Sequence, residues 1–587
     1  MSAGDEKRPD GRAVTPETKN LRMATRALRL HLDELPVDYD LDAPPDHFLA
    51  GLAFMSARQR YDCAESMIGA GFGGTVLGSL ARSVFVDGLR WLWIGDEPSR
   101  LRALLGDLLE ERNRLCKLLD QADVVCPILT RWLMPLPDIA DLTGQSMTWL
   151  DAQPLPGEEV LLQDFLTRSA ILPTAPPSMQ GEHAALLGRI GALLNMAGLR
   201  GIVMILAYAG HGNYLGLQNT LTDDGAIGHD LRADHEALFM QAAAAGATAT
   251  LLGTAAAVPH AWPSDVGRDT FLQRAVELTV DVATAAVPIH RLGTARRAPV
   301  RPTRPAPAYQ PSVLHARAVL RADELLPDVN SIDLVAAASE EFYELVRSMP
   351  IDPWAEGQLA LHVGLGYAAA HSNLEAVMAT YDQPGSGVIG VFAGRMLLEE
   401  AARLLWRFAD RDEGAFKARA KQFFDEYRAA RAKTINILTG SGVPKRDAVR
   451  IFAEPANVVH ITPRDQVAKG RVPMPTISSM LRDMGKPFPE PGWLEVAYSL
   501  LSQITHSTPV GLLHSTRIQH DGFEGNALSP EMLGLTLDVA CLGSAHLIGH
   551  GAVVLTDMAS RAIQYYDQLV RQALLVHDAA RLVHGLD

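Results

Sequence analysis

The chain has 587 residues, of which 48% are hydrophobic and 21% charged, a composition typical of a globular protein long enough to bury several cores. Its formal net charge of -15 argues against an extended surface for duplex DNA, because such a surface has to be basic. A local basic patch that binds a short or single-stranded nucleic acid is still compatible with this charge.

The N-terminal segment and the cysteines bear on where the chain works. Residues 1–20 are polar and lack the apolar segment of a secretory signal, so we expect a disordered N-terminal tail there. The four cysteines show no paired spacing, which favours a reducing compartment, and the predicted location is the cytoplasm. The longest stretch without an Asp, Glu, Lys or Arg, 237–264, is rich in Ala, Gly and Thr and is broken by Pro259. We therefore expect a buried helix there and no membrane contact.

Apolar residues recur at intervals of three and four along much of the chain, which is the pattern of amphipathic helices. In chain order, the clearest such segments are 81–94, 101–119, 393–408 and 415–438. They lack the alternation of Val, Ile and Thr that strands require. Ser529 followed by Pro530 is typical of a helix start, with Ser as the cap and Pro in the first turn. The sequence therefore predicts an all-α protein.

A segment rich in proline and arginine divides the chain into nearly equal parts. Residues 296–311 are RRAPVRPTRPAPAYQP, and such closely spaced prolines exclude a helix interior and favour an extended spacer. We expect this linker to join a first helical domain, 21–295, to a second helical domain, 312–587.

The two parts also resemble each other in sequence. When residue 51 is aligned with residue 364, a constant offset of 313 brings identical residues together without a gap. In the first part these residues are Gly51, Leu52, Ala57, Gly74, Arg82, Arg90, Leu92 and Trp93. A charged helix follows in both parts, and further on His211 aligns with His506. We therefore expect two tandem copies of one helical-bundle domain.

Polar side chains recur at matched positions on these otherwise apolar helices. Arg82 and Asp87 of the first copy correspond to Arg395 and Glu400 of the second. Glu399 lies one helical turn after Arg395. Because a buried arginine needs a carboxylate partner, these residues can form a structural ion-pair network. Alternatively, they line a cleft and hold an anionic group with the guanidinium fork. The sequence leaves both interpretations open.

His211 and His506 are the second recurring pair. A single histidine in an apolar helix is usually a core or capping residue, but its return at the corresponding place in both copies leaves a structural role and a function equally open. Imidazole is the side chain whose ordinary pKa suits acid and base chemistry near neutral pH. These two residues are therefore candidate catalytic groups.

Residues 395–400 (RMLLEE), the charged helix after them and residues 498–506 (YSLLSQITH) resemble an uncharacterised group of bacterial all-helical domains. That group is similar to the HEPN class (higher eukaryote and prokaryote nucleotide-binding). The resemblance covers most of the second copy and, more faintly, the first. It implies a helical bundle that binds or cleaves RNA or a nucleotide in a bacterial stress or anti-phage defence pathway. It further implies an internal pseudo-dimer of the two copies, with Arg395, Ser502 and His506 among the site residues.

The chain departs from this class in one respect. HEPN domains with nuclease activity carry Arg and His on one helix at a short fixed spacing. Neither Arg200 with His211 nor Arg517 with His520 has that spacing. The resemblance is therefore equally compatible with a relative that binds its ligand without cleaving it.

A competing interpretation uses a metal ion. His546 and His550 are four residues apart on an expected helix, a spacing at which two imidazoles reach one ion. No HEXXH motif accompanies them. His514 and His520 lie upstream of this pair, and no cofactor is indicated.

Three functions therefore stand, and each predicts a different arrangement. A module that binds RNA or a nucleotide requires Arg395, Glu400 and His506 in one pocket, beside the basic stretch 411–450. A non-catalytic scaffold for a protein partner requires the same groups to be buried and mutually satisfied. A metal-dependent enzyme requires a carboxylate beside His546 and His550.

Overall fold

The structure is a computed structural model that describes most of the chain. The described residues are 15–35, 45–68, 74–122, 155–171, 196–211, 214–217, 231–259, 265–292, 329–348, 357–383, 385–409, 413–452, 473–519, 522–525, 528–555 and 559–586. Within them nearly every residue is helical, which confirms the predicted all-α class. One two-stranded antiparallel hairpin is the β structure in these ranges. The predicted linker 296–311 lies outside the described residues.

The first half, residues 15–292, contains α1 (Pro16–Asp33), α2 (Pro45–Ser66), α3 (Gly74–Asp96), the 3-10 helix η1 (Pro98–Arg100), α4 (Leu101–Gln121), α7 (Glu158–Ile171), α9 (Met196–Gly210), α10 (Tyr214–Leu217), α11 (Ala233–Ala257) and α12 (Asp265–His290). The prediction of a disordered tail over residues 1–20 is wrong for residues 16–20, because α1 begins at Pro16. The Thr15 hydroxyl accepts the backbone N–H of Thr18 at 3.2 Å and caps this helix.

The second half, residues 329–586, contains α13 (Val329–Ser348), α14 (Gly357–Thr380), α15 (Gly387–Phe408), α16 (Glu413–Gly440), α17 (Lys445–Arg450), α18 (Ile477–Gly485), α19 (Trp493–Thr505), α20 (Pro509–His514), β1 (Thr516–Gln519), β2 (Gly522–Gly525), α21 (Pro530–Val554) and α22 (Ala559–His584). The predicted start of α21 is confirmed, since the Ser529 hydroxyl accepts the backbone N–H of Met532 at 3.3 Å.

Each half is built around one long apolar helix. In the first half α11 packs against α3, α2 and α12, and in the second half α21 packs against α15, α14 and α22. By length and composition α11 and α21 could each cross a membrane, yet 100% and 89% of their apolar windows are buried inside the protein. The predicted buried helix is thus confirmed for the part of 237–264 that lies in α11.

Glycines allow the central helices of each half to touch. A Cβ added to Gly246 of α11 would lie 2.5 Å from the Phe85 Cα of α3. A Cβ added to Gly543 of α21 would lie 2.7 Å from the Leu397 carbonyl carbon of α15. Since real Cβ atoms essentially never come this close to backbone, both helix pairs depend on glycine at their crossing.

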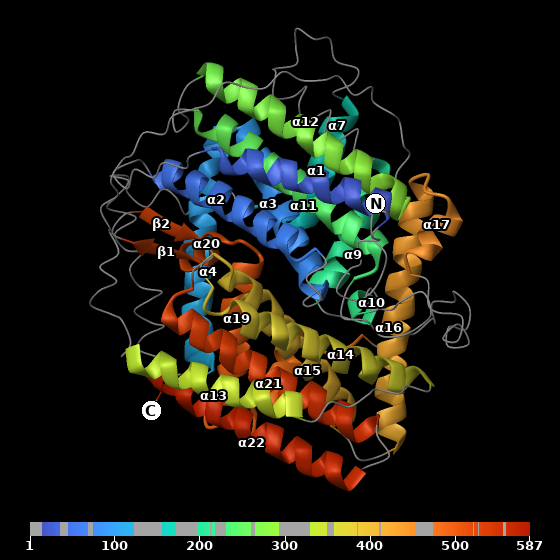
Figure 1. The fold of residues 1–587 in the computed structure, drawn as a ribbon, viewed down its shortest axis with the longest axis vertical. Coiled ribbons are helices and arrows are strands. Elements are labelled where there is room, and N and C mark those ends of the chain that lie inside the picture. The colour runs from blue at the N-terminus through green and yellow to red at the C-terminus, as the bar shows by residue number, and fades with distance from the viewer. Residues whose placement is uncertain are drawn as a thin grey trace, which may run out of the picture.

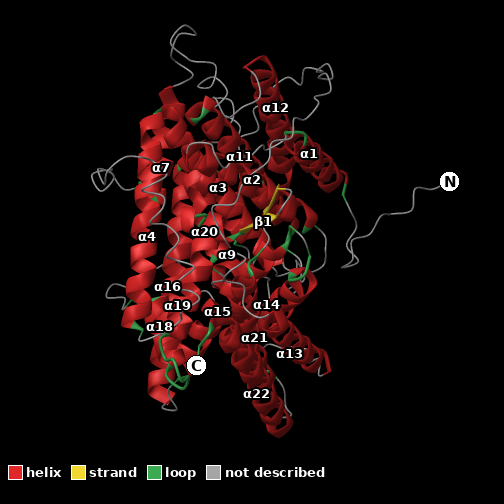
Figure 2. Ribbon diagram, turned by 90° about the vertical axis from the view of Figure 1, so that its left-hand side faces the viewer, coloured by secondary structure: helices red, strands yellow, loops and turns green. Residues whose placement is uncertain are grey.

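Short helices of each half pack on the other half. The helix α10 contacts α14 and α16, while α20 contacts α2 and α4. In Figure 1 the helices of the first half gather at the top and those of the second half at the bottom, with α16 rising past α10 and α9. The side view in Figure 2 shows α4 running down toward α19, which it contacts. The two halves are therefore joined by reciprocal helix contacts.

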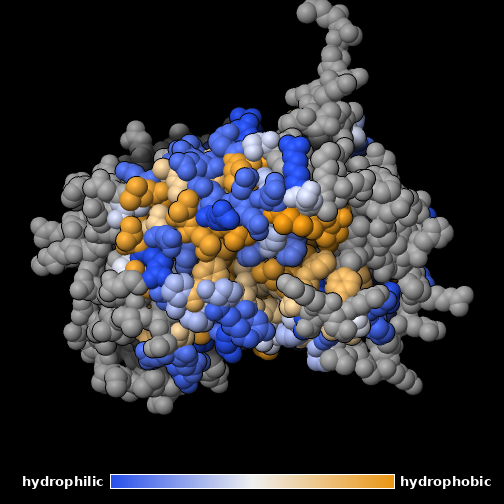
Figure 3. Space-filling view, turned by 90° about the horizontal axis from the view of Figure 1, so that it is seen from below, coloured by the Kyte–Doolittle hydropathy of each residue, from blue (hydrophilic) through white to orange (hydrophobic). Residues whose placement is uncertain are grey.

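The surface at the α22 end mixes apolar and hydrophilic residues (Figure 3). The outer helices of this end expose several large hydrophobic side chains to solvent. They are Leu334 of α13 and Ile563, Leu574, Leu575 and Leu582 of α22.

Candidate functional site

Two arginine–histidine pairs meet between the halves. The Arg82 guanidinium of α3 lies 3.3 Å from the Nδ1 atom of His506, and the Arg395 guanidinium of α15 lies 3.3 Å from the Nδ1 atom of His211. The ring centroids of the two histidines are 6.3 Å apart. Each pair thus takes its arginine from one half and its histidine from the other. We refer to these four residues as the two-histidine site.

The ends of two helices present the histidines. His211 directly follows α9, and His506 directly follows α19. A second arginine of the opposite half anchors each helix end: Arg403 donates to the His211 carbonyl at 2.8 Å, and Arg90 donates to the Ser507 carbonyl at 2.7 Å. These contacts satisfy carbonyls that a helix terminus leaves without a partner.

The predicted carboxylate Glu399 joins the two-histidine site. Its carboxylate pairs with Arg403, lies 3.7 Å from the Arg395 guanidinium and lies 3.5 Å from Nδ1 of His211. Burial opposes ionisation of Glu399, but Arg403, His211 and Arg395 together hold its pKa well below the usual range. A permanent negative charge therefore lies beside His211.

The other predicted residues lie around this centre. Asp87 pairs with Arg90 at 3.0 Å, and Glu400 pairs with Arg403 at 3.3 Å. Glu400 also lines a cavity of about 10 Å³, room for roughly one water molecule. Ser502 lies one turn before His506, and its buried hydroxyl has no hydrogen-bond partner within the described residues. Arg403 connects Glu400 to the two-histidine site, because its guanidinium donates both to Glu400 and to the His211 carbonyl. The convergence of Glu400 and His506 in one pocket stays a prediction.

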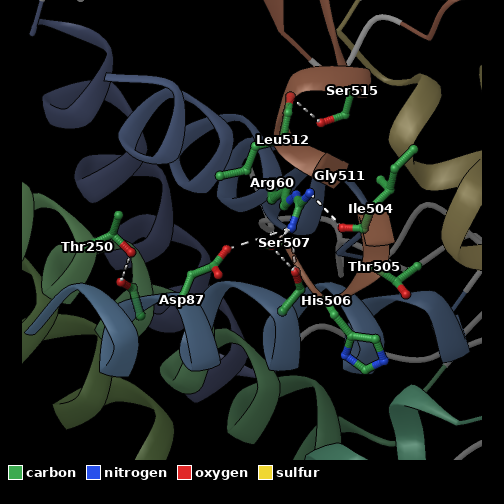
Figure 4. Close-up of polar contacts among 12 residues, drawn as sticks. Arg60, Asp87, Thr250, Ile504, Thr505, His506, Ser507, Gly511, Leu512 and Ser515 are labelled. Atoms are coloured by element: carbon green, nitrogen blue, oxygen red, sulfur yellow. Dashed lines mark hydrogen bonds and ion pairs between the residues drawn. The ribbon is translucent and has the colours of Figure 1, made fainter. Parts of the chain in front are cut away.

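Arg60 of α2 is a buried charge that sequence comparison did not single out. Its guanidinium donates to the hydroxyls of Ser83 and Ser507 and, at 2.9 Å, to the Ile504 carbonyl. The Asp87 carboxylate lies 3.8 Å away, and burial lowers the pKa of Arg60 to about 10. Figure 4 shows these contacts around Ser507, with the His506 ring pointing away from Arg60.

The protonation of both histidines is shifted toward the neutral form. Burial, followed by the positive charges of Arg395 and Arg82, holds the pKa of His506 well below its usual range. Burial also lowers the pKa of His211, but Glu399 opposes this shift. The His211 side chain keeps 32% of its surface exposed.

The basic stretch lies on α16, which packs beside the site. Tyr208 of α9 lies three residues before His211, and its hydroxyl donates to the Ala430 carbonyl of α16 at 3.4 Å. The helix α16 exposes Lys417 and Lys421 to solvent, and Lys421 pairs with Asp425.

The metal candidates have other partners. The Nδ1 atom of His546 lies 2.8 Å from the Tyr566 hydroxyl, and the His550 ring stacks on Phe408 with centroids 5.5 Å apart. Burial lowers the pKa of each histidine to about 4. Among the described residues no group of three His, Cys, Asp or Glu is placed to hold a metal ion, so the carboxylate that this hypothesis requires is missing there.

Comparisons with known protein families, with curated proteins and with solved structures found no match to this chain.

Proposed function

We propose that the chain is a HEPN-like helical module that binds the phosphate of single-stranded RNA or of a nucleotide at the two-histidine site, and cleaves the RNA it binds. The observation that carries this proposal is the meeting of the Arg82–His506 and Arg395–His211 pairs between the halves. Guanidinium and imidazole N–H groups are the donors that phosphate oxygens require. A bacterial stress or anti-phage pathway is the setting that the HEPN resemblance suggests.

We further propose that the two halves are tandem copies that form an internal pseudo-dimer. Their reciprocal contacts support this: each arginine–histidine pair crosses between the halves, and α10 and α20 each pack on the opposite half. The glycine crossings at Gly246 and Gly543 are also alike. A site built from both copies would give a physical reason for keeping them in one chain.

The proposed cleavage is a transesterification that needs no group beyond the site, the RNA and solvent water. The 2′-hydroxyl oxygen of the RNA forms a bond to phosphorus while the bond from phosphorus to the 5′-oxygen breaks. The hydroxyl proton leaves to a base, the 5′-oxygen takes up a proton, and the products are a 2′,3′-cyclic phosphate and a 5′-hydroxyl. Imidazole transfers protons efficiently near neutral pH, and the arginines oppose the negative charge that develops on phosphorus oxygens.

The decisive experiment measures binding and cleavage of labelled single-stranded RNA, with DNA of the same sequence as a control for the 2′-hydroxyl. A His211→Ala/His506→Ala variant is compared with a His546→Ala/His550→Ala variant, both folded by circular dichroism. We expect the first variant to lose cleavage by at least about 100-fold and the second to retain it. If wild type neither binds nor cleaves RNA, the proposal fails.

A non-catalytic scaffold is the second candidate, and the burial of Arg395, Glu399 and Arg403 favours it. Their exposed fractions are 1%, 1% and 6%, and they pair with one another as a structural network would. The exposed apolar side chains of α22 would then suit a protein partner. Under this alternative the His211→Ala/His506→Ala variant is only less stable, and RNA binding is absent in wild type.

A further inference from the structure

The two sides of the two-histidine site differ in charge. At the offset of 313 that aligns Arg82 with Arg395, Val86 takes the place of Glu399. At the same offset Arg60 takes the place of Asn373. The side that holds His506 therefore gains a guanidinium, and the side that holds His211 gains a carboxylate.

The arginine contacts determine which ring nitrogen of His506 carries the proton. A guanidinium can only donate hydrogen bonds, so Nδ1 of His506, at 3.3 Å from Arg82, has to be the acceptor. The proton of the neutral ring is then on Nε2. The charged and titratable groups that face this ring are Arg395, Arg82, His211 and Arg90, and none is an acid.

Carboxylates on neighbouring helices bind other groups. Glu158 of α7 pairs with Arg82, and Asp87 of α3 pairs with Arg90. Glu111 of α4 binds Arg114 and Gln503, and Asp107 of α4 faces Arg90. Within the described residues His506 therefore has no anionic neighbour that would stabilise a second proton.

His211 has different surroundings. Its Nδ1 atom lies 3.3 Å from the Arg395 guanidinium and 3.5 Å from the Glu399 carboxylate. The third charged group that faces it is Arg82. In the neutral ring Nδ1 accepts from Arg395, by the same argument as for His506. When Nδ1 gains the second proton it donates to Glu399, and Nε2 still carries a proton that can be given away. Tyr498, which accepts from Arg395 at 3.1 Å, also approaches Glu399 at 3.5 Å and helps to fix the carboxylate.

We infer that the two histidines have different roles in the proposed RNA site: His506 is a neutral Nε2–H donor that binds a phosphate oxygen, and His211 is the proton donor, with Glu399 as its positioning residue. This inference rests on the proposed function. In the cleavage step, protonated His211 gives its Nε2 proton to the 5′-oxygen as the bond from phosphorus to that oxygen breaks. Solvent water takes the proton of the 2′-hydroxyl as its oxygen bonds to phosphorus.

The roles can be tested without RNA, by following the imidazole nitrogens of the ¹⁵N-histidine-labelled full chain by NMR between about pH 5 and pH 8. Single variants of His211 and His506 assign the two signals. We expect His506 to stay in the neutral Nε2–H form over this range and His211 to gain its second proton at a higher pH. Titration of both rings at the same pH would overturn the inference.

Two matched substitutions test the effect of the carboxylate: one removes it beside His211, and the other adds one on the side that holds His506. Glu399→Gln should lower the pH at which His211 is protonated, and Val86→Glu, one turn beyond Arg82, should raise the pH at which His506 is protonated. No shift of His211 in folded Glu399→Gln would contradict the role of Glu399. These measurements judge the inference even if the protein does not act on RNA.

RNA cleavage gives an independent readout. Glutamine keeps an N–H donor but cannot transfer a proton, so His506→Gln should lower cleavage less than about tenfold and His211→Gln at least about 100-fold. Cleavage by wild type should increase as the pH falls toward the value at which His211 is protonated, and Glu399→Gln should move this profile to lower pH. Equal losses in the two glutamine variants would contradict the division of roles.

Discussion

Ser507 combines burial with an unusual backbone conformation. Its φ angle is 47°, in the left-handed region that suits glycine, and the residue is completely buried. Its hydroxyl lies 2.8 Å from the Ser83 hydroxyl and accepts from Arg60, while its carbonyl accepts from Arg90. Strain of this kind is retained where neighbouring contacts hold the residue in place. Here the contacts of Ser507 hold the chain in this conformation directly after His506.

Replacing Ser507 should separate the strain from the hydrogen bonds. Ser507→Ala keeps the strain and removes one of the three buried oxygens to which Arg60 donates, so we expect a loss of about 1–3 kcal/mol in the free energy of unfolding. Ser507→Gly loses the same bonds but relieves about 1 kcal/mol of strain, so it should be the more stable variant. Urea unfolding measures the free energy of unfolding of both variants. A glycine variant that is less stable than the alanine variant would show that the φ angle is not strained.

His290 should make the protein sensitive to acid. Its Nδ1 atom accepts the Leu292 backbone N–H at 3.0 Å and its Nε2 atom lies 2.6 Å from the Gln241 side-chain oxygen, so the ring is held neutral. Burial lowers its pKa to about 3. Because the unfolded chain binds the proton at a pKa of about 6.5, stability is present above that pH and is lost as the pH falls toward 3.

The acid sensitivity has a direct check. Between pH 7 and pH 5 the loss due to His290 should be about 2 kcal/mol, from roughly 1.4 kcal/mol for each pH unit below 6.5. His290→Gln cannot titrate, so its free energy of unfolding should fall less over this range than that of wild type, even if it is lower at pH 7. Parallel curves for the two proteins would exclude this residue as the cause.

Several site residues were predictable from the sequence because they recur at matched positions in the two halves. Arg82, Arg395 and the two histidines could be found because they recur at matched positions. Arg60 could not be found, because Asn373 stands at the matched position of the second half and an isolated arginine carries no pattern. Its burial depends on partners more than 400 residues away in the chain, Ile504 and Ser507.

At the scale of elements, the glycine crossing of α15 and α21 should be intolerant of a methyl group. Gly543→Ala would place a Cβ 2.8 Å from the Leu397 carbonyl oxygen, so we expect a loss of about 1–3 kcal/mol from overpacking. In the same helix, a Cβ at Gly534 would meet the side chains of Val583 at 3.4 Å and His584 at 3.8 Å, which are ordinary contacts. Gly534→Ala should therefore be neutral or stabilising by about 0.5–1 kcal/mol.

Thermal unfolding of the two glycine variants checks this prediction, because both substitutions lie in α21 and add the same atoms. A similar change in melting temperature for Gly543→Ala and Gly534→Ala would show that α15 moves away from α21 at little cost. The counterpart Gly246→Ala, in α11, should behave like Gly543→Ala.

Element prediction succeeded where periodicity extends over several turns. The predicted helices at 81–94 and 393–408 lie within α3 and α15. The hairpin of β1 and β2 was not predicted, since its four-residue strands are too short to show an alternation. The exchange of α10 and α20 between the halves was not predicted either. Periodicity identifies an apolar face but not the helix that covers it.

At the scale of the whole molecule, the halves depend on each other for buried polar groups. Arg60 of the first half donates to Ile504 and Ser507 of the second, and Arg403 of the second donates to the His211 carbonyl of the first. Separating the halves would remove these hydrogen bonds. A hydrogen bond to a charged group contributes about 1.5–3 kcal/mol, and several would be lost together.

Fragments 1–295 and 312–587 should therefore form a stable complex when they are produced together. We expect them to copurify in equal amounts, with the circular dichroism of the full chain, because the contacts between them do not require the linker. Each fragment alone should be less helical and should aggregate, since its half of the interface exposes apolar helix faces and unpaired charges. Size-exclusion chromatography with light scattering distinguishes the outcomes. If either fragment is monomeric and unfolds as cooperatively alone as in the complex, the interface does not stabilise the halves, and a site composed of Arg82, His211, Arg395 and His506 loses its physical basis.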